Sequence, residues 1–269
     1  MSTLIVIPAR YGSTRLPGKP LAVIEGRTLL ERVVDVAARA AKLTGAAYVV
    51  ATDDERIVRH AGEIGAPAVM TDADLRTGTD RALAAHTACG STADFILNLQ
   101  GDAPFTEADH LARLIECSNT LEADVITPVI RLDWQALDDI RERKLKTPFS
   151  GTTCVRGADG RAFWFSKNIM PAVRNEAELR KQSGMSPVFR HIGLYAYRLS
   201  SLKRFTQLPA GTYETLEGLE QLRFIENGMI VHTVEVERPR ISMSGIDSKE
   251  DADLAAQLIR KHGDPFHGR

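Results

Sequence analysis

The sequence from residue 4 to residue 20 reads Leu4-Ile5-Val6-Ile7-Pro8-Ala9-Arg10-Tyr11-Gly12-Ser13-Thr14-Arg15-Leu16-Pro17-Gly18-Lys19-Pro20. Its first four residues are apolar, mostly branched and followed by a proline, which predicts a short buried strand. The loop after them carries cations and glycines. Open α/β sheets bind ligands at the carboxyl ends of their strands, and such a loop suits an anion. We interpret it as a polyphosphate site; the alternative is a solvated basic turn, since neither common glycine-rich nucleotide motif is present.

The composition is that of an ordinary globular protein. The chain has 269 residues, 43% hydrophobic and 26% charged, with a net charge of −1. This size suits one large domain, or a domain with a small appendage, and the charge balance argues against a nucleic-acid binder. The three cysteines are far apart and lack metal-ligand spacing, as expected of free thiols in a reducing compartment. We see no signal peptide and no membrane-spanning run, so we expect a cytoplasmic protein without a membrane partner.

Predicted strands and helices alternate from residue 4 to residue 130. The expected strands are 4–7, 47–52, 68–70, 95–99 and 125–130. Helices are expected at 28–43, around 57–61, at 77–88 and from Thr106, with Asp109 completing a capping box. Such a rhythm predicts a parallel sheet with helices on both faces. The loops that carry glycines and cations all follow strands, and this convergence supports the polyphosphate interpretation.

The alternation stops after residue 131. We expect a helix at 132–145, a hairpin at 153–165 and a mobile polar loop at 174–187. A strand at 192–197, a helix at 216–226 and a strand at 230–236 follow. The last helix begins after Ser248, with Asp251 in its third position, and ends near residue 262, and the tail beyond it is expected to fray.

Two aspartates are candidate metal ligands. Asp102 follows the strand at 95–99, and Asp247 precedes the last helix. Mg²⁺ takes one or two protein carboxylates together with phosphate oxygens. Asp102 could instead be an ordinary turn residue, and Asp247 a helix N-cap, a role that Ser248 could also fill. As a pair flanking a cationic loop, they favour a metal site.

Two further clusters are candidate ligand contacts. The segment Thr77-Gly78-Thr79-Asp80-Arg81 opens a helix, whose free N–H groups could read a base edge or an anion; a plain capped helix is the alternative. Arg190 precedes His191, and Glu220 precedes Gln221. Arg190 could pair with a ligand carboxylate and Glu220 could bind sugar hydroxyls, or the two could form a surface pair beside a structural histidine.

Together these motifs resemble the 3-deoxy-manno-octulosonate cytidylyltransferases, the CMP-Kdo synthetases, over about residues 3 to 258. The segment 7–20 carries the most specific part of the resemblance. The supporting motifs, in order, are Ala51-Thr52-Asp53, Gly78-Thr79, Asn98-Leu99-Gln100-Gly101-Asp102, Arg190-His191-Ile192-Gly193-Leu194-Tyr195, Leu219-Glu220-Gln221-Leu222-Arg223 and Gly245-Ile246-Asp247.

The resemblance implies a fold and a reaction. The fold is the GT-A-like, nucleotide-diphospho-sugar transferase class of α/β protein, with three α/β/α layers, a mainly parallel sheet and an inserted antiparallel hairpin region. We expect a nucleotide-binding core at 1–130, a sugar-binding and dimerisation portion at 131–235 and a return to the core at 236–269, all in one structural domain. The implied reaction transfers CMP from CTP to the anomeric oxygen of an acidic ulosonate sugar, 3-deoxy-D-manno-octulosonate, and releases pyrophosphate, in a homodimer that uses Mg²⁺. Its product serves lipopolysaccharide or capsule synthesis.

The resemblance also implies site residues. Lys19, Arg15 and Arg10 are the catalytic cations, with Lys19 on the α-phosphate and Arg15 on the leaving pyrophosphate. Asp102 and Asp247 hold the metal. The CTP-binding residues are Pro8, Ala9, Arg10, Arg15, Lys19, Thr77, Gly78, Arg81 and Gln100. The sugar-binding residues are Gln100, Arg190, His191, Tyr195, Glu220 and Gln221.

Departures from the family pattern fall mostly on the sugar side and leave other functions open. Ala103 replaces the family's glutamate, Lys167 its arginine and Thr77 its serine. The alternatives are CMP activation of a related acidic sugar, such as amino-Kdo or a nonulosonate, and an inactive nucleotide-binding paralogue. A glycosyltransferase usually carries an Asp-x-Asp motif, and Asp102-Ala103-Pro104 does not match it.

Overall fold

The computed structural model describes residues 2–12, 15–243 and 245–267, so Ser13, Thr14 and Ser244 of the predicted loops lie outside the described residues. The strands are β1 (Thr3–Ala9), β2 (Val23–Ile24), β3 (Arg27–Thr28), β4 (Ala47–Thr52), β5 (Ala68–Met70), β6 (Phe95–Asn98), β7 (Val125–Asp133), β8 (Thr153–Arg156), β9 (Ala162–Ser166), β10 (Met185–His191), β11 (Tyr195–Arg198) and β12 (Val231–Glu235). The helices are the short η1 (Lys19–Leu21), then α1 (Leu29–Thr44), α2 (Glu55–Glu63), α3 (Gly78–Ala88), α4 (Ala108–Ser118), α5 (Trp134–Lys146), α6 (Glu176–Gln182), α7 (Leu199–Phe205), α8 (Thr212–Glu217), α9 (Gln221–Glu226) and α10 (Lys249–His262).

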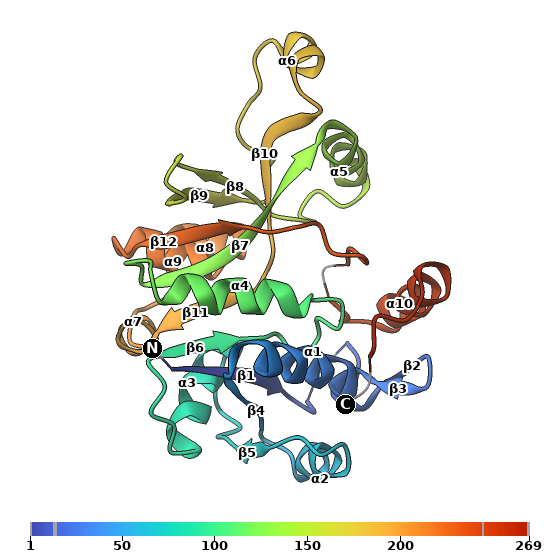
Figure 1. The fold of residues 1–269 in the computed structure, drawn as a ribbon, viewed down its shortest axis with the longest axis vertical. Coiled ribbons are helices and arrows are strands. Elements are labelled where there is room, and N and C mark those ends of the chain that lie inside the picture. Colours follow the sequence, from blue (N-terminus) through green and yellow to red (C-terminus); the bar gives the residue numbers. More distant parts are fainter. Residues whose placement is uncertain (1, 13–14, 244, 268–269) are drawn as a thin grey trace.

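One large mixed sheet organises these elements (Figure 1). Across the described ranges it has ten strands in the order β5-β4-β1-β6-β11-β7-β10-β8-β9, with β12 beside β7. The pairings make β5, β4, β1, β6, β7, β12 and β8 run in one direction and β11, β10 and β9 in the other. The fold is therefore mixed α/β with a mostly parallel sheet.

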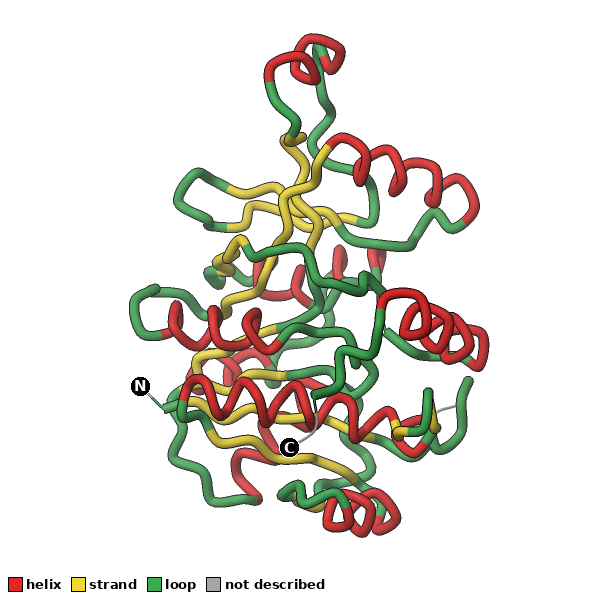
Figure 2. Tube along the Cα trace, turned by 45° about the vertical axis from the view of Figure 1, so that its right-hand side comes forward, coloured by secondary structure: helices red, strands yellow, loops and turns green. Residues whose placement is uncertain are grey.

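Helices cover both faces of this sheet, and β1 shows why. Ile5 and Ile7 belong to the core beneath α1, α4 and α10, whereas Leu4 and Val6 belong to the core beneath α3, α7 and α9. Successive side chains of a strand point to opposite faces, so a strand buried on both faces must be apolar throughout. Figure 2 shows the strands in yellow with helices in red along their flanks.

All five strands predicted between residues 4 and 130 are confirmed, and they run in one direction. β5, β4, β1 and β6 pair in parallel. β7 runs in the same direction, but it does not pair with β6, because β11 lies between the two strands and is antiparallel to both. A strand's place in a sheet depends on long-range pairing, which the order of elements along the chain does not determine.

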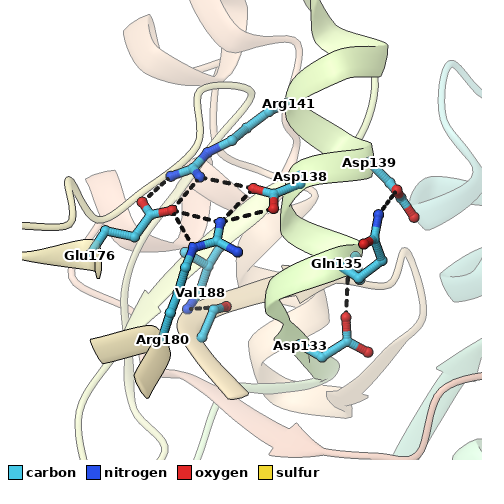
Figure 3. Close-up of polar contacts among 10 residues, drawn as sticks. Asp133, Gln135, Asp138, Asp139, Arg141, Glu176, Arg180 and Val188 are labelled. Carbon is cyan, nitrogen blue, oxygen red and sulfur yellow. Dashed lines mark hydrogen bonds and ion pairs between the residues drawn. The ribbon is translucent and has the colours of Figure 1, made fainter. Parts of the chain in front are cut away.

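The segment predicted as a mobile loop at 174–187 is instead ordered, since it forms α6 and the start of β10. No residue of α6 is buried, so no apolar periodicity marks it. Ion pairs hold it instead: Arg141 and Arg180 both bond Asp138 and Glu176, with N–O distances between 2.7 and 3.1 Å (Figure 3). The element lies at one end of the molecule, beyond α5 and β10 (Figure 1).

Three other boundaries differ from prediction. The strand expected at 192–197 is broken, because β10 ends at His191 and β11 begins at Tyr195. The helix expected at 216–226 is two helices, since Gly218 has a left-handed φ of 62° and ends α8. The capping box expected at Thr106 is absent: α4 begins after Glu107, whose carboxylate accepts the Arg240 N–H at 3.0 Å.

The chain end is docked rather than frayed as far as Phe266. Asp264 accepts hydrogen bonds from the buried Arg32 of α1 at 2.7 and 3.2 Å, and the Arg27 guanidinium lies over the Phe266 ring. The predicted capping box of the last helix, between Ser248 and Asp251, is confirmed. All three cysteines are free thiols. None of the helices formed by the described residues combines the length and apolar character that a membrane crossing requires.

Candidate active site

The ends of β1 and β6 come unusually close, and Gly101 makes this possible. A Cβ at Gly101 would lie 2.2 Å from the carbonyl oxygen of Pro8, far inside van der Waals contact. Only glycine therefore lets the chain leave β6 past the end of β1. The two residues beside it, Gln100 and Asp102, are brought against the cationic loop.

The cationic loop is closed by its own contacts. Gly18 takes a left-handed φ of 67° before η1, and its N–H donates to the Tyr11 carbonyl at 3.1 Å. The Tyr11 ring packs against Gly18, with the Arg56 guanidinium 3.3 Å from the ring centroid. The loop thus returns on itself and presents Lys19 at the start of η1.

Lys19 lies between the two predicted metal ligands. Its Nζ is 2.8 Å from Asp102 Oδ2 and 3.0 Å from Asp247 Oδ1, and Arg15 reaches Asp247 at 3.1 Å. Burial acts to lower the pKa of Lys19, but the two aspartates outweigh it and the net pKa is raised. Lys19 therefore stays protonated, and the two carboxylates converge on one point.

The backbone explains how Asp247 arrives there. The Ile246 N–H donates to the Asp102 carbonyl at 2.9 Å, which ties the two segments together. Ser248 caps α10 through the Asp251 N–H. The Asp247 carboxylate is therefore not the helix cap, and that alternative is excluded.

A cavity of about 310 Å³ lies over this loop. Its lining residues are Pro8, Ala9, Arg10, Gly12, Arg15, Lys19, Pro20, Gly78, Arg81, Gln100, Gly101, Asp102 and Asp247. Every predicted CTP contact except Thr77 is among them; Thr77 instead caps α3 in a capping box with Asp80. Arg10 Nη2 is buried without a hydrogen-bond partner among the described residues. Such an unpaired buried donor is costly unless a ligand satisfies it.

Arg81 is fixed at the edge of this cavity. It is fully buried, and its Nη2 donates to Asp53 at 2.8 Å while Nη1 donates to Thr71 at 2.5 Å. Burial lowers the pKa of Arg81, although Asp53 opposes that shift. Asp53 directly follows β4, a position typical of ligand-edge residues, whereas its neighbour Asp54 caps α2.

A second cavity, of about 460 Å³, adjoins the first. The two share Gly78, Gln100 and Asp102 in their linings. The second contains the whole predicted sugar-binding set, Gln100, Arg190, His191, Tyr195, Glu220 and Gln221. The structure thus sorts the two predicted sets into two neighbouring compartments that meet beyond β6.

Arg190 faces the second cavity without an acidic partner. Its Nη1 donates to the Ser242 hydroxyl at 2.6 Å, and no carboxylate within the described ranges forms an ion pair with it. Burial lowers its pKa, followed by the charges of Arg143 and Arg238. The predicted alternative, a surface pair with Glu220, is wrong, because Glu220 accepts a short hydrogen bond from Thr79.

The remaining sugar-side groups are neutral or polar. His191 is buried, shares a 2.7 Å hydrogen bond with Thr127, and has its pKa lowered by burial to about 3. The Tyr195 hydroxyl donates to Gln221 Oε1 at 3.0 Å. Burial also raises the pKa of Glu220. His191 is therefore a neutral positioning group rather than an acid or base near pH 7.

Sequence reasoning missed several lining residues. Ser242, which contacts Arg190 from an irregular segment, is one of them. Thr79 belongs to a segment that was predicted to contact a ligand, and its hydroxyl donates to Glu220 from the first turn of α3. Lys167, which we noted only as a departure from the family pattern, lines the second cavity. A basic residue two positions after the end of the predicted hairpin was the signal in the sequence that could have identified Lys167.

The donor set fits a magnesium ion. The Lys19 ammonium contacts both Asp102 and Asp247, so a metal ion that binds near this point can contact both carboxylates. No group of three or more His, Cys, Asp or Glu side chains suited to a metal occurs in the described part of the chain. Mg²⁺ commonly binds through one or two carboxylates plus substrate phosphates and does not need a larger protein cage.

Comparisons with known proteins agree with this geometry. A family model described as "Cytidylyltransferase" matches residues 4–236. The chain is 41% identical over 268 residues to a 3-deoxy-manno-octulosonate cytidylyltransferase of Maricaulis maris, covering 98% of this chain and 99% of the relative. A Phocaeicola vulgatus relative of the same name is 36% identical over 265 residues, covering 97% and 98%.

Solved structures are similar as well. The fold matches a CMP:2-keto-3-deoxy-manno-octonic acid synthetase complexed with CTP, with a TM-score of 0.80 and 31% identity, covering 97% of this chain and 99% of that one. A cytidylyltransferase from Leptospira borgpetersenii shares the fold, with a TM-score of 0.60 and 18% identity, covering 100% and 90%.

Proposed function

This chain belongs to the cytidylyltransferase family, and from that premise we propose that it transfers CMP from CTP to the anomeric oxygen of 3-deoxy-D-manno-octulosonate (Kdo), releasing pyrophosphate. The full-length similarity to 3-deoxy-manno-octulosonate cytidylyltransferases supports this choice of sugar. The product would be an activated sugar for lipopolysaccharide or capsule synthesis.

The observation that carries the proposal is the meeting of two cavities of different chemistry. One is lined by Arg10, Arg15 and Lys19, which suits a triphosphate. The other holds Arg190, a half-buried cation that forms no ion pair with a carboxylate of the described residues, which suits a sugar carboxylate. The shared lining at Gln100 brings the two ligands side by side, as group transfer requires.

Charge is the main obstacle that the site must overcome. The triphosphate and the sugar acid are both anions, and their approach is repulsive. Lys19 places its positive charge beside the α-phosphate, which the anomeric oxygen of the sugar attacks. Arg15 and Arg10 bind the leaving pyrophosphate and stabilise its negative charge. Arg190 fixes the sugar carboxylate, so that the anomeric hydroxyl faces the nucleotide cavity.

We also propose Mg²⁺ as the cofactor, held by Asp102 and Asp247. When bound, it neutralises phosphate charge and polarises the sugar hydroxyl. Such polarisation makes a general base unnecessary, in keeping with the neutral His191 and with the Glu220 carboxyl group that accepts a hydrogen bond from Thr79. We assign the fold to the GT-A-like class and expect a homodimer, which light scattering after gel filtration would test.

Pyrophosphate release tests the function. The assay contains CTP, Mg²⁺ and one of a panel of sugar acids: Kdo, its amino-substituted analogue and a nonulosonate. We expect release with Kdo and its loss in excess EDTA. Release with another panel member and none with Kdo would reassign the sugar. Calorimetric binding of CTP without turnover on any acid would support an inactive paralogue instead.

A further inference from the structure

The main chain of Lys167 is held on both sides by charged side chains. Its N–H donates to Glu217 Oε2 at 2.7 Å, and its carbonyl accepts from Lys144 Nζ at 2.5 Å. Hydrogen bonds to ionised groups are about twice as strong as those between neutral ones. The two peptide units flanking Lys167 therefore have little freedom, and the start of its side chain is fixed at the wall of the second cavity.

Lys144 and Glu217 also bond other segments that line this cavity or lie beside its lining. Lys144 Nζ additionally donates to the carbonyls of Ser150 at 2.5 Å, Pro148 at 3.2 Å and Gly151 at 3.3 Å. Glu217 Oε1 accepts from the Ser166 hydroxyl at 2.7 Å and directly precedes lining residues 218–221. One ammonium and one carboxylate thus join three segments of the sugar-side wall.

This wall has an excess of positive charge. Lys144 is surrounded by carbonyl dipoles, and no carboxylate in the described ranges forms a side-chain ion pair with Lys167 or Arg190. Burial lowers the pKa of Lys167, with Glu217 opposing, and burial followed by the charge of Lys167 lowers the pKa of Lys144. Lys144, Lys167 and Arg190 outnumber the Glu217 carboxylate that lies beside them, and this excess of positive charge favours an anionic ligand.

We propose that Lys144 and Glu217 are positioning residues that fix the main chain of Lys167, so that its ammonium, together with Arg190, recognises the carboxylate of the sugar acid. The proposal rests on the proposed function. Lysine is a point charge on a flexible stem and lacks the planar fork of arginine. Fixing its main chain limits the positions its ammonium can reach.

The test compares Lys144→Met with Lys146→Met, an exposed lysine in the same last turn of α5. We expect Lys144→Met to raise the KM for Kdo about tenfold or more, because charge-assisted hydrogen bonds are lost. The KM for CTP and the parameters of Lys146→Met should stay within about twofold of wild type. Lys144→Arg, which keeps the charge and the donors, should recover part of the loss.

A double-mutant cycle separates positioning from general structure. If Lys144 acts through Lys167, then Lys144→Met should add less than about twofold to the KM for Kdo in a Lys167→Met background. Additive effects, or a KM for Kdo in Lys144→Met equal to that of Lys146→Met, would overturn the inference.

Glu217→Gln provides an independent variant should Lys144→Met fail to fold. It keeps the shape and removes the charge, so a raised KM for Kdo with an unchanged KM for CTP supports the proposal, and unchanged values for both refute it. The activity of the wild-type protein shows whether a negative result refutes the proposed function or only the positioning role. Absence of pyrophosphate release from wild type with every sugar acid refutes the proposed function, whereas an active wild type with unaffected variants refutes only the positioning role.

Discussion

Lys19 meets Asp102 and Asp247 across 83 and 228 residues of chain, and their contact depends on a few local devices. Gly101 allows the approach of two strand ends, and the hydrogen bond from Ile246 to Asp102 brings in the second carboxylate. The pKa of Lys19 is raised, so its charge is present below its usual pKa of 10.5 and is lost only above it. The ammonium is thus available throughout the physiological range.

Removing this charge should affect turnover far more than folding. We expect Lys19→Ala to lower kcat roughly 10³-fold, the lower end of the effect of a cation in other phosphoryl transfers. Circular dichroism and thermal unfolding should stay close to wild type, because the side chain is partly exposed and its partners are on the surface of a cavity. Lys249→Ala, an exposed lysine of α10, is the matched control. Near-normal turnover in Lys19→Ala would falsify its assignment.

His191 should remain neutral over the whole working pH range. Burial lowers its pKa to about 3, and the folded state therefore disfavours the charged ring at any pH above that value. We expect its ring carbon resonances to show no titration between pH 5 and pH 8, and the pH profile of kcat/KM to show no inflection from it near 6.5. An NMR titration with inflection near the usual histidine pKa would contradict the buried, neutral state.

The sequence predicted those site residues that belong to short, continuous motifs. The cations of residues 10–19 and both aspartates could be predicted because each belongs to a short motif at the end of a predicted strand. Ser242, Lys144 and Glu217 could not, because each acts on a residue that is remote in sequence. Their roles arise only when separate segments pack together.

Among the elements, α6 depends most directly on charge. It buries no residue, and Glu176 binds Arg141 and Arg180 (Figure 3). Hydrogen bonds from Arg141 and then from Arg180 lower the pKa of Glu176 from 4.5 to about 2. A carboxyl group with a depressed folded-state pKa stabilises the fold above its unfolded value and loses that contribution as pH falls.

Glu176→Gln should therefore loosen α6 at neutral pH. We expect amide exchange in residues 176–182 to become several-fold faster than in wild type at pH 7. As pH falls from 4.5 toward 2, wild type should converge on the variant because its own carboxylate becomes protonated. Glu178→Gln, on the same helix, removes a carboxylate that is bonded to the exposed Lys181 at 3.3 Å, and it should have little effect. Equal exchange in both variants at pH 7 would exclude the network as the support of α6.

The predicted elements were right where hydrophobic periodicity determines them and wrong where it does not. α1 and α10 have apolar stripes and clear caps, and both were predicted within a residue or two. α6 and the start of β10 are polar, and α8 ends at a glycine that periodicity alone cannot place. The break between β10 and β11 falls at Ile192-Gly193-Leu194, where the apolar residues around the glycine made the segment look like one continuous strand.

For the whole molecule, the two adjoining cavities predict how ligands stabilise the fold. Ligands that bind only the folded state raise the unfolding free energy, by about 2.7 kcal/mol at 100 times the dissociation constant. We expect CTP with Mg²⁺ to raise the melting temperature, and EDTA to reduce that rise. In Asp102→Asn the rise with CTP should no longer depend on Mg²⁺. A full Mg²⁺ effect in that variant would remove Asp102 from the metal site.

The sheet order was the least predictable feature of the molecule as a whole. β11, from the second half of the chain, completes the sheet between two strands of the first half, and β12 pairs with β7. The predicted division at residues 130 and 235 stays a prediction, but the strands of those portions share one sheet.

Gly101 has a consequence for inhibitor design. Any side chain there would collide with the Pro8 carbonyl, so the position tolerates no other amino acid without moving a strand end. Gly101 also lines the nucleotide cavity. A compound whose affinity depends on the peptide groups of Pro8 and Gly101 would bind a surface that cannot be altered by substitution at residue 101. Resistance mutations would have to arise at other contacts, where loss of a cation also lowers the affinity for CTP.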